Sequence, residues 1–527
     1  MKILVADQLS DAGIEILRQC AQVDVRTGLK PDQLRSIVGD YEALIVRSQT
    51  KVTANIIEAG TKLQVIGRAG VGIDNIDVEA ATARGILVIN SPEGNIISTA
   101  EHTIAMMLAM ARQIPKANDL LHKGTWNRSL KGTEIRNKTL GLIGLGRVGG
   151  EVAQLAKGLR MNIIAYDTMV SEAKAEKLGV KLENLKTLLK TSDFISVHIP
   201  LNSKTKGLIG QEQLKLMKPT AMIINCARGG IIEEQALNDA LDKGIIAAAA
   251  IDVFSEEPAQ NNILVKSDKV ITTPHLAAST SEAEMSASKD IAEQIVSVLS
   301  GNPPKSPINA PAIPAEVLKV IGPYMELGKT IGRIAMQLVT GHLESLMIHY
   351  EGLISREETS PIKVAILSGL FETMTDERVN IVNADRIAAG RGLRVIEQKD
   401  IACENYTNMI SVEIVTSAAK AVVGASVLRG KTYITRVDDY WMEIEPSANY
   451  MVFTEHKDRP GMIGVVGTIL GNAHINIKQM HVSSGVNLGN NAMMALCMDQ
   501  RPSEQCYQQM LAIPDMYRVV VVNLTKI

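Results

Sequence analysis

Short apolar runs alternate with amphipathic helical patterns through the first 97 residues of the chain. The apolar runs cover residues 2–6, 43–47, 63–70 and 86–90, and a helical pattern follows the first of them at residues 12–19. Continuous apolar runs of this length are typical of strands that are buried on both faces of a sheet. Because strands that alternate with helices form βαβ units, the pattern predicts an α/β fold with a parallel sheet.

A second, longer series of elements follows. The segment from Ala100 to Gly124 predicts one long helix, buried between two lobes, whose methionines belong to the core and bind no ligand. Beyond this helix the apolar runs predict a complete doubly wound parallel sheet, with strands near residues 140–143, 162–166, 194–198, 221–225, 247–252 and 269–272.

The segment GNPPKSPINAPAIP, residues 301–314, marks a domain boundary. Its five prolines exclude a continuing helix and predict a stiff, exposed linker. Residues from about 315 to 447 again mix helix and strand, and a last unit starts near Asn449. At the usual size of ~150 residues for a domain, a chain of 527 residues predicts three or four domains.

A glycine turn at Gly144, Gly146 and Gly149 joins the strand at 140–143 to a helix and has the form G-x-G-x-x-G. In a dinucleotide site the first glycine permits the tight turn, the second admits the pyrophosphate, and the third lets the helix pack on the sheet. The following strand ends at Asp167, whose carboxylate can accept hydrogen bonds from a ribose and repels a 2′-phosphate. A glycine turn without a ligand is the alternative, but the order of elements predicts an NAD site.

Charged residues follow three strands of the second series at the edge where such sheets bind ligands. Arg228 can hold a carboxylate through two parallel hydrogen bonds. His275 can remove a hydroxyl proton, and a glutamate, either Glu256 or Glu257, can orient its ring. The spacing does not choose between the two glutamates. The set predicts hydride transfer from a 2-hydroxy acid to a nicotinamide.

The composition limits the classes of partner. With 46% hydrophobic residues, 21% charged residues and a net charge of −2, the chain has no basic surface for nucleic acid. Five scattered cysteines without C-x-x-C spacing predict neither disulfides nor a metal site and favour a cytoplasmic location. The start of the chain lacks the features of a signal peptide, and no apolar run approaches the ~18 residues needed to span a membrane, so we expect no membrane partner.

Several segments resemble the D-2-hydroxyacid dehydrogenases: GLIGLGRVG, SDFISVHIPLNSKTKGLIG, LMKPTAMIINCARGGIIEEQAL, AIDVFSEEP and TPHLAAST. The resemblance implies that Arg228, Glu257 and His275 are the catalytic residues, and so it selects Glu257 over Glu256. It also implies NAD as the cofactor, and we expect further cofactor contacts from Arg147, Val148 and Asp252. One departure is Ala277, where many relatives have glycine beside the histidine.

Within this family the chain is similar to long members with two additional domains. The resemblance implies a Rossmann-type NAD-binding domain at 98–285 and a split, flavodoxin-like substrate-binding domain at 1–97 and 286–302. An α+β intervening regulatory domain at 315–447 and a C-terminal ACT domain at 449–527, with βαββαβ order, would follow.

The resemblance also implies a phosphorylated substrate. Arg47, Arg68 and Arg128 match family positions around the substrate phosphate, the last supplied by a neighbouring subunit of a tetramer. We therefore expect oxidation of 3-phosphoglycerate to 3-phosphohydroxypyruvate, the first step of the phosphorylated pathway to L-serine. Surface ion pairing is the alternative for each arginine alone.

The last unit contains YMVFTEHKDRPGMIGVVGTILGNAHINIKQMHVSS, which is similar to an ACT domain. By this resemblance His456, Asp458 and Asn476 hold L-serine at an interface between two such units and transmit inhibition by the end product. A dimerisation unit without a ligand is the alternative, and Asp458 stands where some serine-sensing relatives have asparagine. In the preceding domain Arg429, Lys431 and Arg436 could bind a regulatory anion, but an exposed basic strand is the favoured interpretation.

Two other functions are weighed against this hypothesis. A general 2-hydroxyacid dehydrogenase that reduces glyoxylate or hydroxypyruvate would use the same catalytic residues and would be indifferent to the phosphate. A non-catalytic, NAD-sensing corepressor would bind transcription factors and show no turnover. The near-neutral charge and the ACT-like end of the chain argue against the corepressor.

Overall fold

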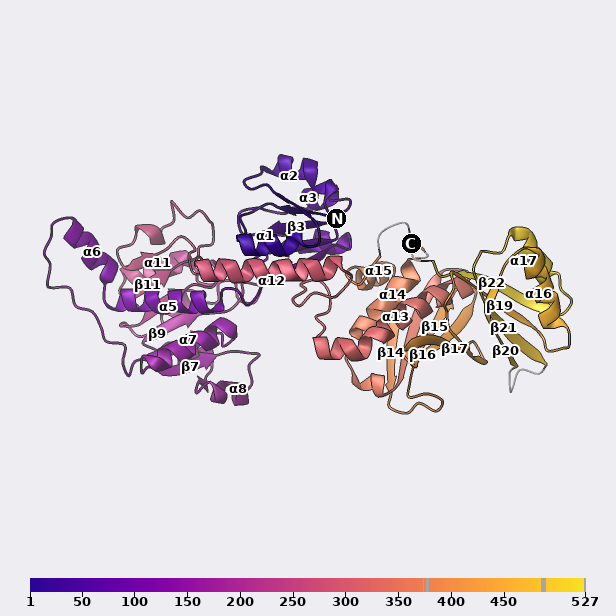
Figure 1. Ribbon diagram of the computed structural model, residues 1–527. Helices are drawn as coiled ribbons and strands as arrows, with labels where there is room; N and C mark the ends of the chain where they lie inside the picture. Colours follow the sequence, from indigo (N-terminus) through magenta and orange to yellow (C-terminus); the bar gives the residue numbers. More distant parts are fainter. Residues whose placement is uncertain (373, 376–378, 485–489, 526–527) are drawn as a thin grey trace.

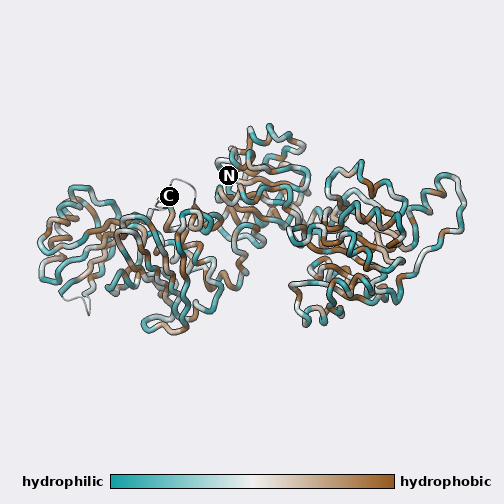
Figure 2. Tube along the Cα trace, turned by 180° about the vertical axis from the view of Figure 1, so that it is seen from behind, coloured by the Kyte–Doolittle hydropathy of each residue, from teal (hydrophilic) through white to brown (hydrophobic). Residues whose placement is uncertain are grey.

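The computed structural model describes residues 1–372, 374–375, 379–484 and 490–525. These ranges contain four sheets, each the centre of one unit of an elongated molecule (Figure 1). The first two sheets are parallel and the last is antiparallel, so the predicted α/β fold with a different C-terminal half is confirmed. Figure 2 shows that the hydrophobic segments concentrate on the strands inside the units, whereas the loops at the periphery are hydrophilic.

The first sheet has the order β2-β1-β3-β4-β5, which is the flavodoxin-like order. Four of its strands confirm the predicted apolar runs, whereas β2 was missed because QVDV alternates polar and apolar residues and lies only partly buried at the edge. The strands are β1 (Lys2–Val5), β2 (Gln22–Val25), β3 (Ala43–Val46), β4 (Val65–Arg68) and β5 (Leu87–Asn90). The helices between them are α1 (Asp11–Arg18), α2 (Pro31–Ile37), α3 (Ala54–Ala59) and α4 (Val78–Ala83).

The second sheet has the order β12-β11-β10-β9-β6-β7-β8, so the direction of winding reverses between β6 and β9. Ligands of such sheets bind at this reversal, outside the carboxyl ends of the strands. The strands are β6 (Thr139–Ile143), β7 (Asn162–Tyr166), β8 (Lys181–Leu182), β9 (Phe194–Val197), β10 (Met222–Asn225), β11 (Ala248–Ile251) and β12 (Val270–Thr272). The intervening helices are α7 (Arg147–Gly158), α8 (Glu172–Lys177), α9 (Leu185–Thr191), α10 (Gln211–Leu214) and α11 (Glu234–Asp242). All six predicted strands are confirmed, and only the two-residue edge strand β8 was missed.

The single long helix predicted from Ala100 to Gly124 is wrong, because the structure has α5 (Ile96–Ala111) and α6 (Ile114–His122) instead. The chain breaks at Gln113, which has a left-handed backbone with φ of 52°. Pro115 explains the break, since a proline ring in a continuous helix would meet the carbonyl four residues earlier. The methionines of α5 are buried as predicted, but no residue of α6 is buried.

The long helix α12 (Ser281–Leu299) connects the two sheets and packs on the first (Figure 1). It approaches the sheet closely, because a Cβ at Gly67 of β4 would lie only 2.9 Å from Ile291. The linker that follows is not the exposed spacer that its prolines predict. Ile308 donates a backbone hydrogen bond to the Val88 carbonyl, so this segment adds to the edge of β5. The residues between the prolines of this segment retain the backbone N–H and C=O groups that can pair with an edge strand.

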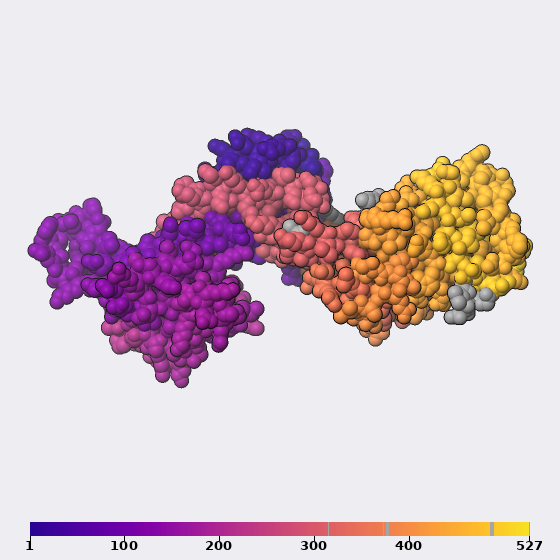
Figure 3. Space-filling model, turned by 60° about the horizontal axis from the view of Figure 1, so that its bottom comes forward, coloured from indigo at the N-terminus to yellow at the C-terminus, as the bar shows by residue number. Residues whose placement is uncertain are grey.

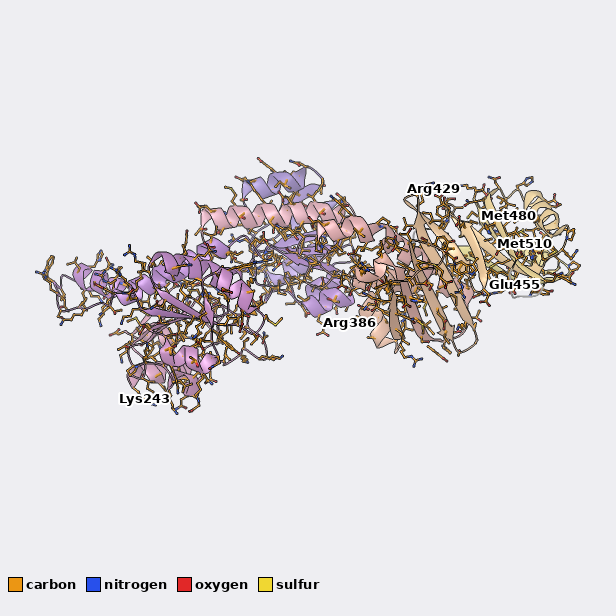
Figure 4. The ribbon with its side chains drawn as sticks, turned by 90° about the horizontal axis from the view of Figure 1, so that it is seen from below. Lys243, Arg386, Arg429, Glu455, Met480 and Met510 are labelled. Carbon is orange, nitrogen blue, oxygen red and sulfur yellow. The ribbon has the colours of Figure 1, made fainter. Side chains whose placement is uncertain are left out.

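The third unit is a six-stranded sheet with the order β14-β13-β15-β16-β17-β18, packed against helices. Its elements are α13 (Ala315–Leu338), β13 (Leu343–Gly352), α14 (Ser360–Phe371), α15 (Ala384–Gly390), β14 (Arg394–Asp400), β15 (Asn408–Thr416), β16 (Lys420–Leu428), β17 (Lys431–Val437) and β18 (Tyr440–Ile444). It contacts the first unit directly. Asn380 donates a hydrogen bond to the Gly85 carbonyl at 2.7 Å. Nη1 of Arg386, a residue labelled in Figure 4, lies 3.5 Å from Oε1 of Glu79.

The fourth unit has the predicted βαββαβ order and an antiparallel sheet ordered β20-β21-β19-β22. Its elements are β19 (Tyr450–Lys457), α16 (Met462–Asn472), β20 (Ile477–Ser484), β21 (Asn491–Met498), α17 (Glu504–Leu511) and β22 (Met516–Asn523). Met451, Phe453 and Cys497 belong to the same buried cluster as Ile410 and Val412 of the third unit. The third and fourth units therefore share one hydrophobic core.

The close contact of α13 with α14 at Gly332 predicts how a substitution there changes the stability of the protein. A Cβ at Gly332 would lie 2.1 Å from the Ile366 carbonyl oxygen, so Gly332→Ala should lower the free energy of unfolding by about 1–3 kcal/mol. Gly322→Ala in the same helix is the matched control. Its Cβ would meet nothing closer than Leu318 at 3.9 Å, and we expect a gain of up to about 1 kcal/mol. Scanning calorimetry of both variants measures the difference, and equal melting temperatures would contradict the close helix contact.

Candidate active site

Two adjoining cavities of about 420 and 640 Å³ lie where the carboxyl ends of the first two sheets face each other. Both are lined by Gly72, Asp74, Arg228 and His275. The first two of these residues follow β4 of the first sheet, and the last two follow β10 and β12 of the second. The cleft between the two units therefore contains the candidate site.

The glycine turn has the geometry that a bound pyrophosphate requires. Gly144 has φ of 100°, and a Cβ there would lie 2.4 Å from the His198 carbonyl oxygen. A Cβ at Gly149 would lie 2.2 Å from the Gly144 carbonyl oxygen, so only glycine lets α7 approach this closely. At Gly146, the N-cap of α7, a Cβ would meet nothing within 4 Å, and no side chain caps the helix. The open helix N-terminus fits an anionic group of a dinucleotide.

Asp167, at the end of β7, lies beside this turn and is half-buried. One carboxylate oxygen accepts a hydrogen bond from the Leu145 backbone at 2.8 Å, and the other accepts from Met169 and Val170. A carboxylate has about four lone-pair positions, so capacity remains for a ribose hydroxyl. Val148 lines the smaller cavity.

Arg147 is exposed at the start of α7, with its guanidinium 3.9 Å from a carboxylate oxygen of Glu93. The cofactor contacts predicted for Arg147, Val148 and Asp167 remain predictions.

His275 and Glu257, which both line the larger cavity, form a hydrogen-bonded pair. His275 Nδ1 lies 2.9 Å from Glu257 Oε2, and the other carboxylate oxygen accepts from the Phe254 backbone at 3.1 Å. With Nδ1 donating to the carboxylate, Nε2 is left as a proton acceptor. The geometry thus pairs the histidine with Glu257, the glutamate selected by resemblance.

Asp252 holds the loop that contains this histidine. Its carboxylate has 0% exposure and accepts hydrogen bonds from Thr273, Leu276 and Ala277 at 2.6–3.0 Å. Burial raises the pKa of Asp252, but these bonds and one from His102 outweigh burial and hold the pKa below its usual value. The Asp252 carbonyl accepts from the backbone of His275, whose φ is 55°.

Asp252 is thus enclosed by protein groups, and its predicted contact with the cofactor remains a prediction. Ala277 is buried and donates its backbone hydrogen to Asp252, and its φ does not lie in the left-handed region that favours glycine. The methyl group at this position is therefore compatible with the loop.

Three arginines line the larger cavity: Arg47, Arg68 and Arg228. Glycines let two of them lie against the backbone, because a Cβ at Gly70 would be 1.8 Å from Arg68 Nη1 and a Cβ at Gly72 would be 2.1 Å from Arg228 Nη2. Burial, and next the charge of Arg228, lower the pKa of Arg68 to about 10. Such a concentration of positive charge fits a multiply charged anion.

The fourth predicted arginine does not join them. Arg128 is exposed on the loop that follows α6 and lines neither cavity. This helix and loop project from the second unit in Figure 3, at the end opposite the third and fourth units. The prediction that Arg128 serves the site of a neighbouring subunit remains untested by a single chain.

The three residues predicted to bind serine do not form one open site within this chain. His456 is 2% exposed and donates from Nδ1 to the Ala492 carbonyl at 3.0 Å, and burial lowers its pKa. Asp458 and Asn476 are exposed, the first directly after β19 and the second directly before β20. Their role at an interface between two chains remains a prediction.

Sequence reasoning missed two residues that shape the site. Asp7, only 2% exposed, accepts hydrogen bonds from the backbones of Arg47 and Thr50 at 2.6 and 3.1 Å. Asn75 donates to the carbonyls of the same two residues, at 2.6 Å each. Together they fix the turn that carries Arg47. The position of Asp7, directly after the first apolar run, was the available signal.

The described residues contain neither a membrane-spanning helix nor a cluster of metal ligands. No helix there is long and apolar enough to cross a membrane. Nor does this part of the chain contain a group of three or more histidine, cysteine, aspartate or glutamate side chains that could hold a metal ion.

Two family models match the chain. The model described as "D-isomer specific 2-hydroxyacid dehydrogenase, NAD binding domain" matches residues 104–277. The model described as "D-3-phosphoglycerate dehydrogenase intervening domain" matches residues 320–438. The two matched segments contain the second and most of the third unit.

Curated relatives match over nearly the whole chain. A D-3-phosphoglycerate dehydrogenase of a Synechocystis species is 45% identical over 94% of this chain and 90% of that protein. One of Methanocaldococcus jannaschii is 43% identical over 99% of this chain and 100% of that protein. Among solved structures, an Aquifex aeolicus D-lactate dehydrogenase complexed with NAD and lactic acid is 26% identical, with a TM-score of 0.52. That similarity covers 57% of this chain and 96% of that chain.

His198 lines the smaller cavity, and its pKa predicts how the stability of the protein changes with pH. Burial lowers the pKa of His198 to about 4, whereas an unfolded histidine titrates near 6.5. As the pH falls from about 6.5 to 4, the unfolded state takes up a proton that the folded state does not. The free energy of unfolding should therefore decrease within this window and be unaffected by this group above it.

Scanning calorimetry between about pH 7 and pH 4.5 measures this slope. We expect His198→Gln to flatten the fall of the melting temperature, whereas His122→Gln, in an exposed position of α6, should leave the slope unchanged. A slope in His198→Gln as steep as in the unmodified protein would show that the imidazole of His198 is not the responsible group.

Proposed function

The chain belongs to the D-3-phosphoglycerate dehydrogenases of the D-2-hydroxyacid dehydrogenase family, and from this premise we propose how its residues oxidise 3-phospho-D-glycerate to 3-phosphohydroxypyruvate. One observation carries the assignment: Arg47, Arg68 and Arg228 line a single cavity beside the His275–Glu257 pair. A substrate with a carboxylate and a phosphate presents negative charge at both ends, and three guanidiniums match that distribution.

We assign His275 Nε2 as the acceptor of the proton from the C2 hydroxyl. Glu257 keeps Nδ1 protonated and stabilises the imidazolium that forms. Arg228 holds the substrate carboxylate through parallel hydrogen bonds and so fixes the orientation of C2. NAD, when bound, accepts the hydride from C2. Asp252 acts through the loop, by holding the backbone that positions His275.

The cofactor is NAD, and we assign the β6–α7 turn to its pyrophosphate. Gly144, Gly146 and Gly149 shape the turn, and Arg147 and Val148 lie at the start of the helix beside it. Asp167 is the proposed partner of the adenosine ribose, where a carboxylate would repel the extra phosphate of NADP.

At the other end of the substrate, we assign Arg47 and Arg68 to the phosphate, together with Arg128 of the partner subunit. A homo-tetramer is the proposed assembly. Ile114, Leu121 and Trp126, which are 55%, 57% and 78% exposed, support it, because an apolar group of this kind on the projecting arm is typical of a covered surface.

The domain roles follow from the same assignment. Residues 1–97 and 286–302 bind the substrate, 98–285 bind NAD, 315–447 are the intervening domain, and 449–527 are an ACT domain. We propose that L-serine binds between two ACT domains, with contacts from His456, Asp458 and Asn476, and inhibits this first step of its own synthesis. The five free cysteines are compatible with a reducing cytoplasm, which is the proposed location.

The catalytic assignment predicts the effect of removing the base. His275→Ala should lower kcat by about 10²–10⁴-fold, because proton removal from C2–OH loses its acceptor. NAD affinity, measured by fluorescence titration, should stay within about twofold. Glu257→Gln should also lower kcat, whereas the neighbouring Glu256→Gln is the matched control and should leave it unchanged. Loss of NAD binding together with turnover would indicate misfolding and contradict the assigned role.

The substrate assignment predicts a preference that is measured in the reverse direction. NADH consumption should be much faster with 3-phosphohydroxypyruvate than with hydroxypyruvate at equal low concentration, because only the former engages Arg47 and Arg68. L-Serine should slow the reaction, and Asp458→Ala should remove that inhibition without changing the uninhibited rate. Equal use of the two substrates would leave a general 2-hydroxyacid dehydrogenase, and NAD binding without any turnover would favour the corepressor.

A further inference from the structure

Three carboxylates line the larger cavity: Glu257, which pairs with His275, and Asp74 and Glu284, each of which pairs with one of the arginines. Asp74 Oδ2 lies 3.2 Å from Arg228 Nε, and Glu284 Oε1 lies 2.9 Å from Arg47 Nη2. Both acids line the same cavity as their partners. A substrate that brings a carboxylate to Arg228 and a phosphate to Arg47 therefore meets an internal anion at each end.

Both ion pairs can separate at a small cost in free energy. The side chains of Asp74 and Glu284 are 74% and 44% exposed, so each carboxylate can turn into solvent and be hydrated there. Ion pairs as exposed as these are weak. Asp74 contacts Arg228 through Nε alone, whereas a free carboxylate can accept two parallel hydrogen bonds from a guanidinium.

The third arginine has a side-chain nitrogen without a hydrogen-bond partner among the described residues. This atom, Nε of Arg68, is buried. Burial, and next the charge of the nearby Arg228, lower the pKa of Arg68 to about 10. Two of the three guanidiniums thus face an acid in the cavity, and the third has a buried Nε without a hydrogen-bond partner among the described residues.

The two ion pairs also join different parts of the fold. Asp74 follows β4 of the first sheet and Arg228 follows β10 of the second, so this pair spans the cleft between the units. Arg47 follows β3, and Glu284 lies in the first turn of α12. Each end of the cavity therefore has its own acid.

We propose that Asp74 and Glu284 compete internally with the substrate, Asp74 for the carboxylate position on Arg228 and Glu284 for the phosphate position on Arg47. Substrate binding is then an exchange of anions: each acid leaves its arginine when the substrate arrives and returns when the product departs. The exchange keeps the arginines oriented in the free enzyme and limits the affinity for the trianionic ligand. This inference rests on the function proposed above.

Asp74→Asn and Glu284→Gln test the two ends separately. Initial rates of NADH consumption give KM and kcat for 3-phosphohydroxypyruvate and for hydroxypyruvate. Asp74→Asn should lower KM about two- to fivefold for both substrates, because both contain the carboxylate. Glu284→Gln should lower KM by a similar factor for the phosphorylated substrate alone. In both variants kcat should stay within about twofold.

Glu282→Gln is the matched control, since it removes the same charge from the same turn of α12 but does not line the cavity. It should leave both KM values unchanged, which separates competition at the arginines from a general change of net charge. Melting temperatures of all variants check that the fold is intact.

Two other results for KM would contradict the proposed competition at the arginines. A raised or unchanged KM in both variants would overturn it and would mean that the acids only orient the arginines. An equal fall in KM for the trianion in all three variants would mean that net charge is responsible.

If the proposed function is wrong, the kinetic assay gives a different result. The unmodified protein would then fail to prefer 3-phosphohydroxypyruvate, and calorimetric titration with inorganic phosphate would replace the kinetic assay. Tighter phosphate binding by Glu284→Gln than by the unmodified protein would still support exchange at Arg47, and equal binding would overturn it.

Discussion

The buried carboxylate of Asp252 is the interaction on which the site depends. It follows β11, and its hydrogen bonds organise the segment after β12 in which His275 adopts a left-handed backbone. Such a conformation is unfavourable for a residue other than glycine and persists only where its surroundings fix it. The carboxylate remains charged despite burial because its oxygens accept several hydrogen bonds. The same loop leads directly into α12, the helix that joins the two units.

The larger cavity of the cleft brings positive charges from both units together. Three guanidiniums in one cavity repel one another, and the protein offsets this repulsion with acids on its walls and with glycines that let the arginines lie against the backbone. Asp7 and Asn75 fix the turn that carries Arg47 through hydrogen bonds to its backbone. The side chains that contact an anion are thus held by residues that do not contact it.

The C-terminal half is built on a different principle. Its two sheets share one hydrophobic core, and Arg333 connects them further by donating to the Leu524 carbonyl while it pairs with Glu372. Burial raises the pKa of Glu372, but the bonds from Lys329 and Arg333 outweigh burial and lower it. This half contacts the first unit through Asn380 and Arg386. A displacement of the third unit relative to the first must break these contacts.

The βαββαβ order of the last unit was inferred from its resemblance to an ACT domain, whereas the sequence by itself determined the apolar strands of both parallel sheets and the glycine turn. Each of these depends on local patterns: apolar runs, glycine spacing and the alternation of elements. It also supplied the candidate residues Arg228 and His275 and the two candidate glutamates, because the carboxyl ends of strands are visible in the chain, whereas the family resemblance selected Glu257. The polar edge strand β2 was missed, and the helix at 100–124 was overextended because apolar content outweighed the local effect of Pro115.

Only the tertiary structure decided which groups meet. Residues far apart in the chain become neighbours when two parallel sheets face each other, as Asp74 and Arg228 do across the cleft and Arg47 and Glu284 do at its edge. The docking of residues 306–309 on β5 and the core shared by the last two units likewise join segments with no common local pattern. Periodicity records which face of an element is buried, but the partner of that face is fixed only when the whole chain packs.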